Sequence, residues 1–189
     1  MNSSKLFFVT LLSSTFGLSC YAADTYKVDP VHSSVIFSTK HLGVTDFYGR
    51  FNEINGTVTF DPADASKSSV DITVPAESLD THNDKRNQHL KSPDFFNSKQ
   101  FPNLTFKSTK VEGTGNTYRV TGDLTIHGVT KPVTVEFKRG PDGKGGQGEM
   151  RGGGETQFTI KRSDYEMKFM TPQVGDDVTI ILSLEGVKQ

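Results

Sequence analysis

The clearest fold signal in the chain is the stretch TYRVTGDLTI, residues 117–126. Apolar residues or glycine stand at every second position from Tyr118 to Ile126, and polar residues stand between them. Because successive side chains of a β-strand point to opposite faces, this alternation predicts a strand with one dry and one wet face. Turn residues at 128–132 and a second alternating run at 133–137 follow, so the sequence predicts a β-hairpin here.

The same period of two recurs along most of the chain. It is found at residues 35–41, 54–60, 70–74, 104–107, 118–126, 133–137, 158–161 and 178–184. These runs predict an all-β fold of about eight antiparallel strands, and closing such a sheet into an up-and-down barrel removes its exposed edges. A two-sheet sandwich is the alternative that periodicity leaves open. Residues 139–154 are rich in glycine and lack the alternation, which predicts a loop.

One segment departs from the strand pattern. Residues 81–90 contain no glycine, no proline and, after Thr81, no β-branched residue, which is typical of a short helix. Thr81 is the expected N-cap, and Pro93 is expected to begin a further helical turn. The sequence therefore predicts a short helical insertion near residues 81–97.

Charge and composition exclude several classes of partner. The 189 residues carry 21 Lys and Arg against 22 Asp and Glu, a net charge of -1. A balanced charge provides no positive field for a nucleic acid, so we expect no nucleic-acid partner.

The amino-terminal residues indicate export. Lys5 precedes an apolar run at 6–18, and the small residues Cys20 and Ala22 provide a cleavage site. This pattern predicts a signal peptide over residues 1–22 and a single domain over 23–189, with no integral membrane segment after cleavage. An uncleaved anchor and lipidation of Cys20 are the alternatives. The predicted mature chain has no cysteine, which excludes thiol catalysis.

Catalytic and metal-binding signatures are absent from the sequence. No G-x-S-x-G elbow, Walker loop or H-E-x-x-H motif occurs, and the carboxylates are scattered over predicted wet faces. We therefore expect no catalytic residues, no cofactor and no metal.

The predicted dry faces point instead to an apolar ligand. They are rich in phenylalanine, and a barrel interior left partly unfilled is an apolar tube suited to a lipid chain. The side chains expected in the lumen are Val35, Phe37, His41, Val58, Phe60, Phe95, Phe96, Leu104, Phe106, Val120, Leu124, Val135, Phe158, Ile160, Ile180 and Leu182. Phe95 and Phe96 are expected near one mouth. Candidates for a polar head group are His41, Arg86, His89 and Arg162, since arginine suits phosphate.

Several longer stretches carry a resemblance to a known family. They are DPVHS at 29–33, LDT at 79–81, HLKSPDFF at 89–96, FPNLTF at 101–106 and GDLTIHGVTKPV at 122–133. In combination they resemble the YceI-like family of exported lipid-binding proteins, over essentially the whole predicted mature chain.

This resemblance implies an extended lipocalin-like barrel in the periplasm that carries a polyisoprenoid, an isoprenoid quinone or another long-chain lipid in its lumen. It also implies no required metal and a possible homodimer. One departure from the family pattern is Glu166, which stands where the family often has glycine and bears on the local turn. Two rival functions remain: an envelope stress or interaction protein with a filled core, and an isoprenoid-processing enzyme.

Overall fold

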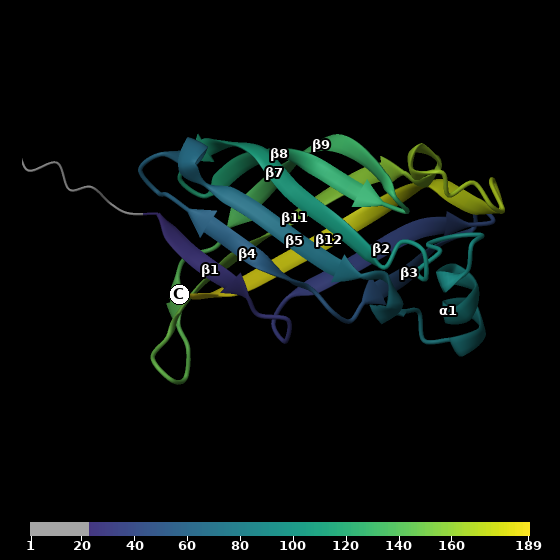
Figure 1. The fold of residues 1–189 in the computed structure, drawn as a ribbon, viewed down its shortest axis with the longest axis horizontal. Helices are drawn as coiled ribbons and strands as arrows, with labels where there is room; N and C mark the ends of the chain where they lie inside the picture. The colour runs from purple at the N-terminus through teal and green to yellow at the C-terminus, as the bar shows by residue number, and fades with distance from the viewer. Residues whose placement is uncertain (1–22) are drawn as a thin grey trace, which may run out of the picture.

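One continuous curved sheet dominates the computed structural model, which describes residues 23–189 (Figure 1). Its strands are β1 (Asp24–Val28), β2 (Ser34–His41), β3 (Thr45–Phe51), β4 (Asn55–Phe60), β5 (Ser69–Pro75), β6 (Leu79–Asp80), β7 (Asn103–Thr114), β8 (Thr117–Ile126), β9 (Val129–Arg139), β10 (Gly143–Lys144), β11 (Met150–Lys161) and β12 (Val174–Lys188). The α-helix α1 spans Asp84–Lys91, and 3-10 turns occupy Ala65–Lys67, Ala76–Ser78 and Arg162–Tyr165. The signal-peptide prediction lies outside the described residues.

Pairing between β11 and β12 closes the sheet into a barrel. The hydrogen-bonded order runs β11, β9, β8, β7, β5, β4, β1, β12, and β12 then pairs antiparallel with β11 from Arg151↔Val187 to Lys161↔Asp177. These eight strands form a ring, which confirms the predicted all-β barrel and rules out the sandwich. Closure leaves no edge strand in the ring, which is the physical advantage expected of a barrel.

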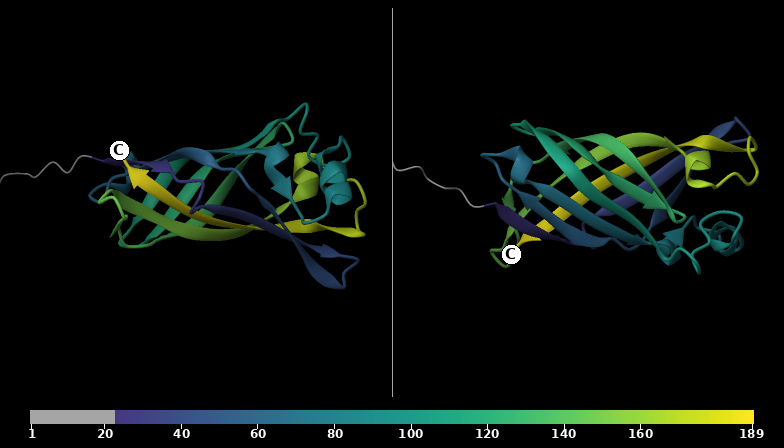
Figure 2. Two further views of the ribbon diagram at one scale, coloured as in Figure 1. Left: turned by 90° about the horizontal axis from the view of Figure 1, so that it is seen from below. Right: turned by 45° about the horizontal axis from the view of Figure 1, so that its top comes forward.

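The ring is not built from the same eight strands that alternation predicts. The run at 35–41 is β2, which pairs with β12 beside the ring and, with β3 and β6, extends the wall beyond it. β1 completes the ring between β4 and β12 and was not predicted, because its five residues are too short for a clear alternation. Figure 2 shows the β2–β3 hairpin projecting at the end of the barrel that carries α1.

The predicted glycine-rich loop is partly strand. β11 begins at Met150, so Gly152, Gly153 and Gly154 all lie in the sheet. A Cβ atom on Gly153 would come within 2.1 Å of the carbonyl oxygen of Leu184, so only glycine allows this approach of β11 to β12. The glycines therefore mark close strand packing rather than a flexible connection.

The helical insertion is confirmed, but its cap is not Thr81. The side chain of Asn83 accepts a hydrogen bond from the Arg86 amide at 3.0 Å and caps α1. Thr81 is buried before the helix, where its hydroxyl lies 2.6 Å from Oδ1 of Asn87. Asparagine caps helices as well as threonine does, and it stands directly before the first helical residue.

The apolar core follows the inside of the barrel in three clusters. One is centred on Ile54, Ile72 and Leu79, a second on Val111, Tyr118, Val120 and Val135, and a third on Leu124, Ile126, Tyr165 and Met167. Within residues 23–189 no helix has both the length and the apolar character needed to span a bilayer.

Candidate functional site

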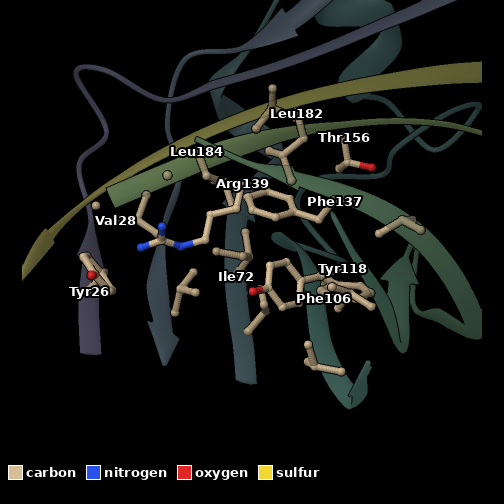
Figure 3. Close-up of a pocket in the computed structure, with 18 of the residues that line it drawn as sticks. Tyr26, Val28, Ile72, Phe106, Tyr118, Phe137, Arg139, Thr156, Leu182 and Leu184 are labelled. Atoms are coloured by element: carbon tan, nitrogen blue, oxygen red, sulfur yellow. The ribbon is translucent and has the colours of Figure 1, made fainter. Parts of the chain in front are cut away.

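A cavity of about 160 Å³ lies inside the ring of strands. Its walls are almost entirely apolar, and they come from strands on every side of the barrel (Figure 3). The aromatic part of the lining comprises Tyr26, Phe60, Phe106, Tyr118, Phe137 and Phe158. Such a surface excludes water and favours a hydrocarbon.

The volume sets what this conformation can hold. An apolar cavity of about 150 Å³ is known to stay dry and to admit one benzene-sized guest. The barrel cavity is of the same order, so the present side-chain positions accommodate only part of a long chain. A longer ligand needs more room than this volume provides.

Most of the predicted lumen residues line this cavity. They are Val35, Val58, Phe60, Leu104, Phe106, Val120, Leu124, Val135, Phe158, Ile180 and Leu182. The structure brings them together because each occupies an inward position of its strand. The register places Phe158 opposite Ile180 between β11 and β12, and Phe106 opposite Leu124 between β7 and β8.

The other predicted lumen residues lie towards the α1 end, outside the lining. Phe37 and Phe96 both pack on Phe51, with ring centroids 5.8 and 5.5 Å away. Phe95 lies 5.1 Å from the His89 ring. Ile160 packs in the cluster around Tyr165. The prediction of His41 as a lumen residue is wrong, because it ends β2 and is exposed to solvent.

The predicted head-group residues do not face the cavity either. Arg162 is 3% exposed, and its guanidinium donates to the carbonyls of Gly175, Met167 and Val174 at 2.7–2.9 Å. Arg86 stacks over the Phe47 ring at 4.6 Å and donates to the Thr81 carbonyl at 2.6 Å.

His89 is also held outside the cavity. Its Nε2 lies 2.9 Å from a carboxylate oxygen of Asp94. The interactions of all three side chains organise the α1 end of the molecule. We therefore reassign Arg86, His89 and Arg162 from head-group candidates to residues that stabilise the fold.

A different arginine supplies the polar end of the cavity. Arg139, at the end of β9, places its guanidinium 4.3 Å from the centre of the Phe60 ring and pairs with Asp142. The hydroxyl of Tyr26 donates to Asp142 at 3.4 Å, and burial, with a smaller contribution from Asp142, raises the pKa of Tyr26. Figure 3 shows the Arg139 side chain reaching between Val28 and Tyr26.

Thr156 is the other polar group of interest in the lining. It is 6% exposed, and its hydroxyl is the only buried side-chain polar atom in residues 23–189 without a hydrogen-bond partner. It lies on β11 opposite Leu182.

Alternation could have located both polar residues. Val133, Val135 and Phe137 alternate inward, and Arg139 is the next member of that series. Thr156 likewise precedes Phe158 by two residues on β11. Both were missed because the glycine-rich composition of 139–154 obscured the strands that contain them.

A polar cluster lies close to Glu185, a residue of the cavity lining. Nη1 of Arg151 is 2.7 Å from Asp29 and 2.5 Å from Glu185, and Nδ1 of His32 is 2.8 Å from Asp29. Asp29, His32 and Glu185 are grouped closely enough to resemble a metal site. The guanidinium of Arg151 already provides the positive charge between the two carboxylates, so the group is an ion-pair network.

Comparisons with known proteins agree with this architecture. The model of the YceI-like domain matches residues 26–186. Protein YceI of Escherichia coli O6:H1 is 38% identical over 183 residues, which covers 96% of each chain. The crystal structure of Burkholderia cenocepacia BcnA is 32% identical with a TM-score of 0.73, covering 84% of this chain and 98% of that one.

A more distant structure shares the fold alone. It is a polyisoprenoid binding domain from Saccharophagus degradans implicated in plant cell wall breakdown. It is 16% identical with a TM-score of 0.67, covering 87% of this chain and 98% of that one. The extent of the domain match and the identity to Protein YceI lead to one conclusion: the chain belongs to the YceI-like family.

Proposed function

We propose that the protein is a non-catalytic periplasmic carrier that binds a long apolar amphiphile, such as a polyisoprenoid, in the barrel. The observation that carries this proposal is the apolar cavity enclosed by the ring of strands. A filled core would make the folded protein more stable, because an empty apolar cavity loses packing contacts. We therefore interpret the cavity inside the closed barrel as a site that binds part of an apolar ligand.

The energetics of such a site favour a long chain. Each methylene group moved from water to an apolar lining contributes about 0.8 kcal/mol, so affinity grows with the length of chain that is enclosed. The polyisoprenoid binding domain of Saccharophagus degradans shares the fold and supports this ligand class. The amino-terminal pattern of Lys5 and the apolar run at 6–18 supports export to the periplasm.

The first test is direct identification of a bound lipid. Protein purified from its native envelope is extracted with organic solvent, and the extract is analysed by mass spectrometry. We expect a long-chain lipid in an amount comparable with the protein. An empty extract, together with no uptake of prenyl or acyl chains by the protein, would favour the filled-core interaction protein instead.

A substitution that fills the cavity provides the matched test. Val120→Phe adds a ring to an inward position of β8, and we expect at least a tenfold loss of affinity for a prenyl alcohol. Thr121→Phe is the control, because Thr121 is the next residue on the strand and its hydroxyl contacts Thr134 on the outer face. Circular dichroism establishes that both variants are folded. Equal affinities for the two folded variants would place the binding site elsewhere.

Mass spectrometry of the ligand also separates a carrier from an enzyme. Tyr26, Arg139 and Glu185 are titratable residues in the lining, so chemistry on a bound ligand has candidate groups. We expect the ligand to be recovered with unchanged mass after incubation with the protein. A mass change that is lost in Tyr26→Phe would support the isoprenoid-processing enzyme.

A further inference from the structure

We propose that the Thr156 hydroxyl is a specificity contact, which hydrogen-bonds an oxygen atom carried by the ligand inside the barrel. The inference rests on the proposed lipid-binding function and narrows its ligand class. The ligand is then an apolar chain that bears a hydroxyl or carbonyl group, rather than a pure hydrocarbon.

The unpaired state of Thr156 is the first observation. Among residues 23–189 its Oγ1 is the only buried side-chain oxygen or nitrogen without a hydrogen-bond partner. Two other polar side chains of the lining have partners: Ser68 accepts from the Asp61 amide at 3.0 Å, and Tyr26 donates to Asp142. A buried group without a partner is destabilising, so its presence at one defined point calls for an explanation.

The surroundings of Thr156 are the second observation. It lies on β11 directly opposite Leu182 and two residues from Phe158, and all three line the cavity. Figure 3 shows it beside Leu182 and near the ring of Phe137. A buried water is typically held by two to four polar partners, and this apolar neighbourhood offers it too few.

The depth of Thr156 in the barrel is the third observation. Arg139 is paired with Gly154, and Thr156 is the next inward position of β11. The hydroxyl therefore lies further along β11 than the pair formed by Arg139 and Asp142. A ligand oxygen that bonds Thr156 therefore lies beyond this pair, among apolar side chains of the lining.

Valine is the informative replacement. It has nearly the shape of threonine and an equal or greater preference for strands, so the barrel can accept it without strain. An unsatisfied buried hydroxyl costs free energy, and its removal by an isosteric apolar group is neutral or stabilising. The hydroxyl thus opposes the stability of the empty protein, which is the behaviour expected of a group kept for a ligand.

The experiment measures affinity and thermal stability of Thr156→Val in the otherwise intact protein, freed of lipid. The probes are geranylgeraniol and the hydrocarbon that lacks only its hydroxyl. We expect Thr156→Val to weaken binding of the alcohol about 3- to 10-fold, to leave the hydrocarbon within twofold, and to raise the Tm of the empty protein by about 2–4 °C. Thr156→Ser, which retains the hydroxyl, should keep most of the discrimination between the probes.

Thr159→Val on the same strand is the control for strand preference. Thr159 is exposed, and its hydroxyl lies 3.1 Å from that of Thr179 on the outer face. The Thr159→Val substitution should leave the affinity for both probes unchanged. Equal effects of Thr156→Val on the two probes, or a fall in the Tm of the empty protein, would overturn the inference while leaving the carrier function intact. Failure of wild-type protein to bind either probe would instead overturn the proposed function and this inference with it.

Discussion

At the scale of single residues, Arg162 shows how an apparent ligand residue serves the fold. It is 3% exposed, and its guanidinium holds the backbone carbonyls of Gly175, Met167 and Val174 together with the hydroxyl of Thr171. Burial lowers the pKa of Arg162, although arginine remains charged at any accessible pH. An arginine side chain suits phosphate binding, but only the tertiary contacts show that backbone carbonyls accept the hydrogen bonds of this guanidinium.

Replacement of this arginine is expected to be costly. Arg162→Met leaves several buried carbonyls without donors, and we expect a loss of about 3–5 kcal/mol in the free energy of unfolding, measured with urea. Affinity for a prenyl alcohol should stay within about twofold, because Arg162 does not line the cavity. Arg119→Met, at an exposed position of β8, should change stability by less than about 0.5 kcal/mol. A large loss of ligand affinity in folded Arg162→Met would restore the head-group interpretation.

Glu166 is a second residue at which local sequence and local structure conflict. It ends the 3-10 turn Arg162–Tyr165 with φ of 61°, in the left-handed region that favours glycine. This conformation explains in physical terms why glycine is expected there. The carboxylate of Glu166 pairs with Lys168 at 2.6 Å, so the side chain also has a contact that glycine could not make.

At the scale of elements, the Arg151 network joins three segments that are distant in the sequence. Asp29 follows β1, Arg151 is the second residue of β11, and Glu185 lies near the end of β12. Hydrogen bonds from His32, from Arg151 and from the Val31 amide hold the pKa of Asp29 well below its usual range. The network therefore favours the charged form of Asp29 only when these elements are assembled.

The depressed pKa predicts a pH dependence of stability with a definite sign. The unfolded chain takes up a proton at Asp29 near about pH 4, whereas the folded protein does so only at much lower pH. The stabilisation is thus present above about pH 4 and is lost as the pH falls below it. We expect Asp29→Asn to be less stable than wild type at about pH 7, and to lose less of its urea midpoint between about pH 5 and pH 2.

A surface ion pair supplies the comparison for this experiment. Asp46 lies 3.0 Å from Lys40, with both side chains about half exposed, and such pairs contribute little. At every pH, Asp46→Asn should therefore have nearly the same urea midpoint as the wild-type protein. An acid response in Asp29→Asn identical to that of wild type would show that the network does not depend on the charge of Asp29.

At the scale of the whole molecule, the relation between ligand length and lumen volume is the central question. The cavity of about 160 Å³ is lined by aliphatic side chains and by six aromatic rings. Tight packing around it resists small displacements, so binding of a longer chain requires discrete rotamer changes. The barrel wall itself is held by closure between β11 and β12 and has no need to open.

A series of linear alcohols of increasing length tests this view. We expect each added methylene group to strengthen binding by up to about 0.8 kcal/mol while it enters the barrel, measured by isothermal titration calorimetry. The gain should fall off once further carbons require ring displacement, and vanish once they reach solvent. An affinity independent of chain length would mean that the alcohols bind to the surface. Val120→Phe should shift the fall-off to shorter chains, because its ring occupies part of the same space.

What the sequence alone determined is local: the period of two placed most strands and their inward faces, as in Tyr118–Ile126, because strand alternation depends only on neighbouring residues. The order of those strands, the part played by β1, and the inclusion of Gly152–Gly154 in β11 depend on pairings far apart in the chain. Only the tertiary structure likewise decided the hydrogen-bond partners of Arg162, the position of Arg139 and the unpaired state of the Thr156 hydroxyl. A side chain's partners and the volume left between side chains are properties of the assembled barrel, since no local pattern records what lies across its lumen.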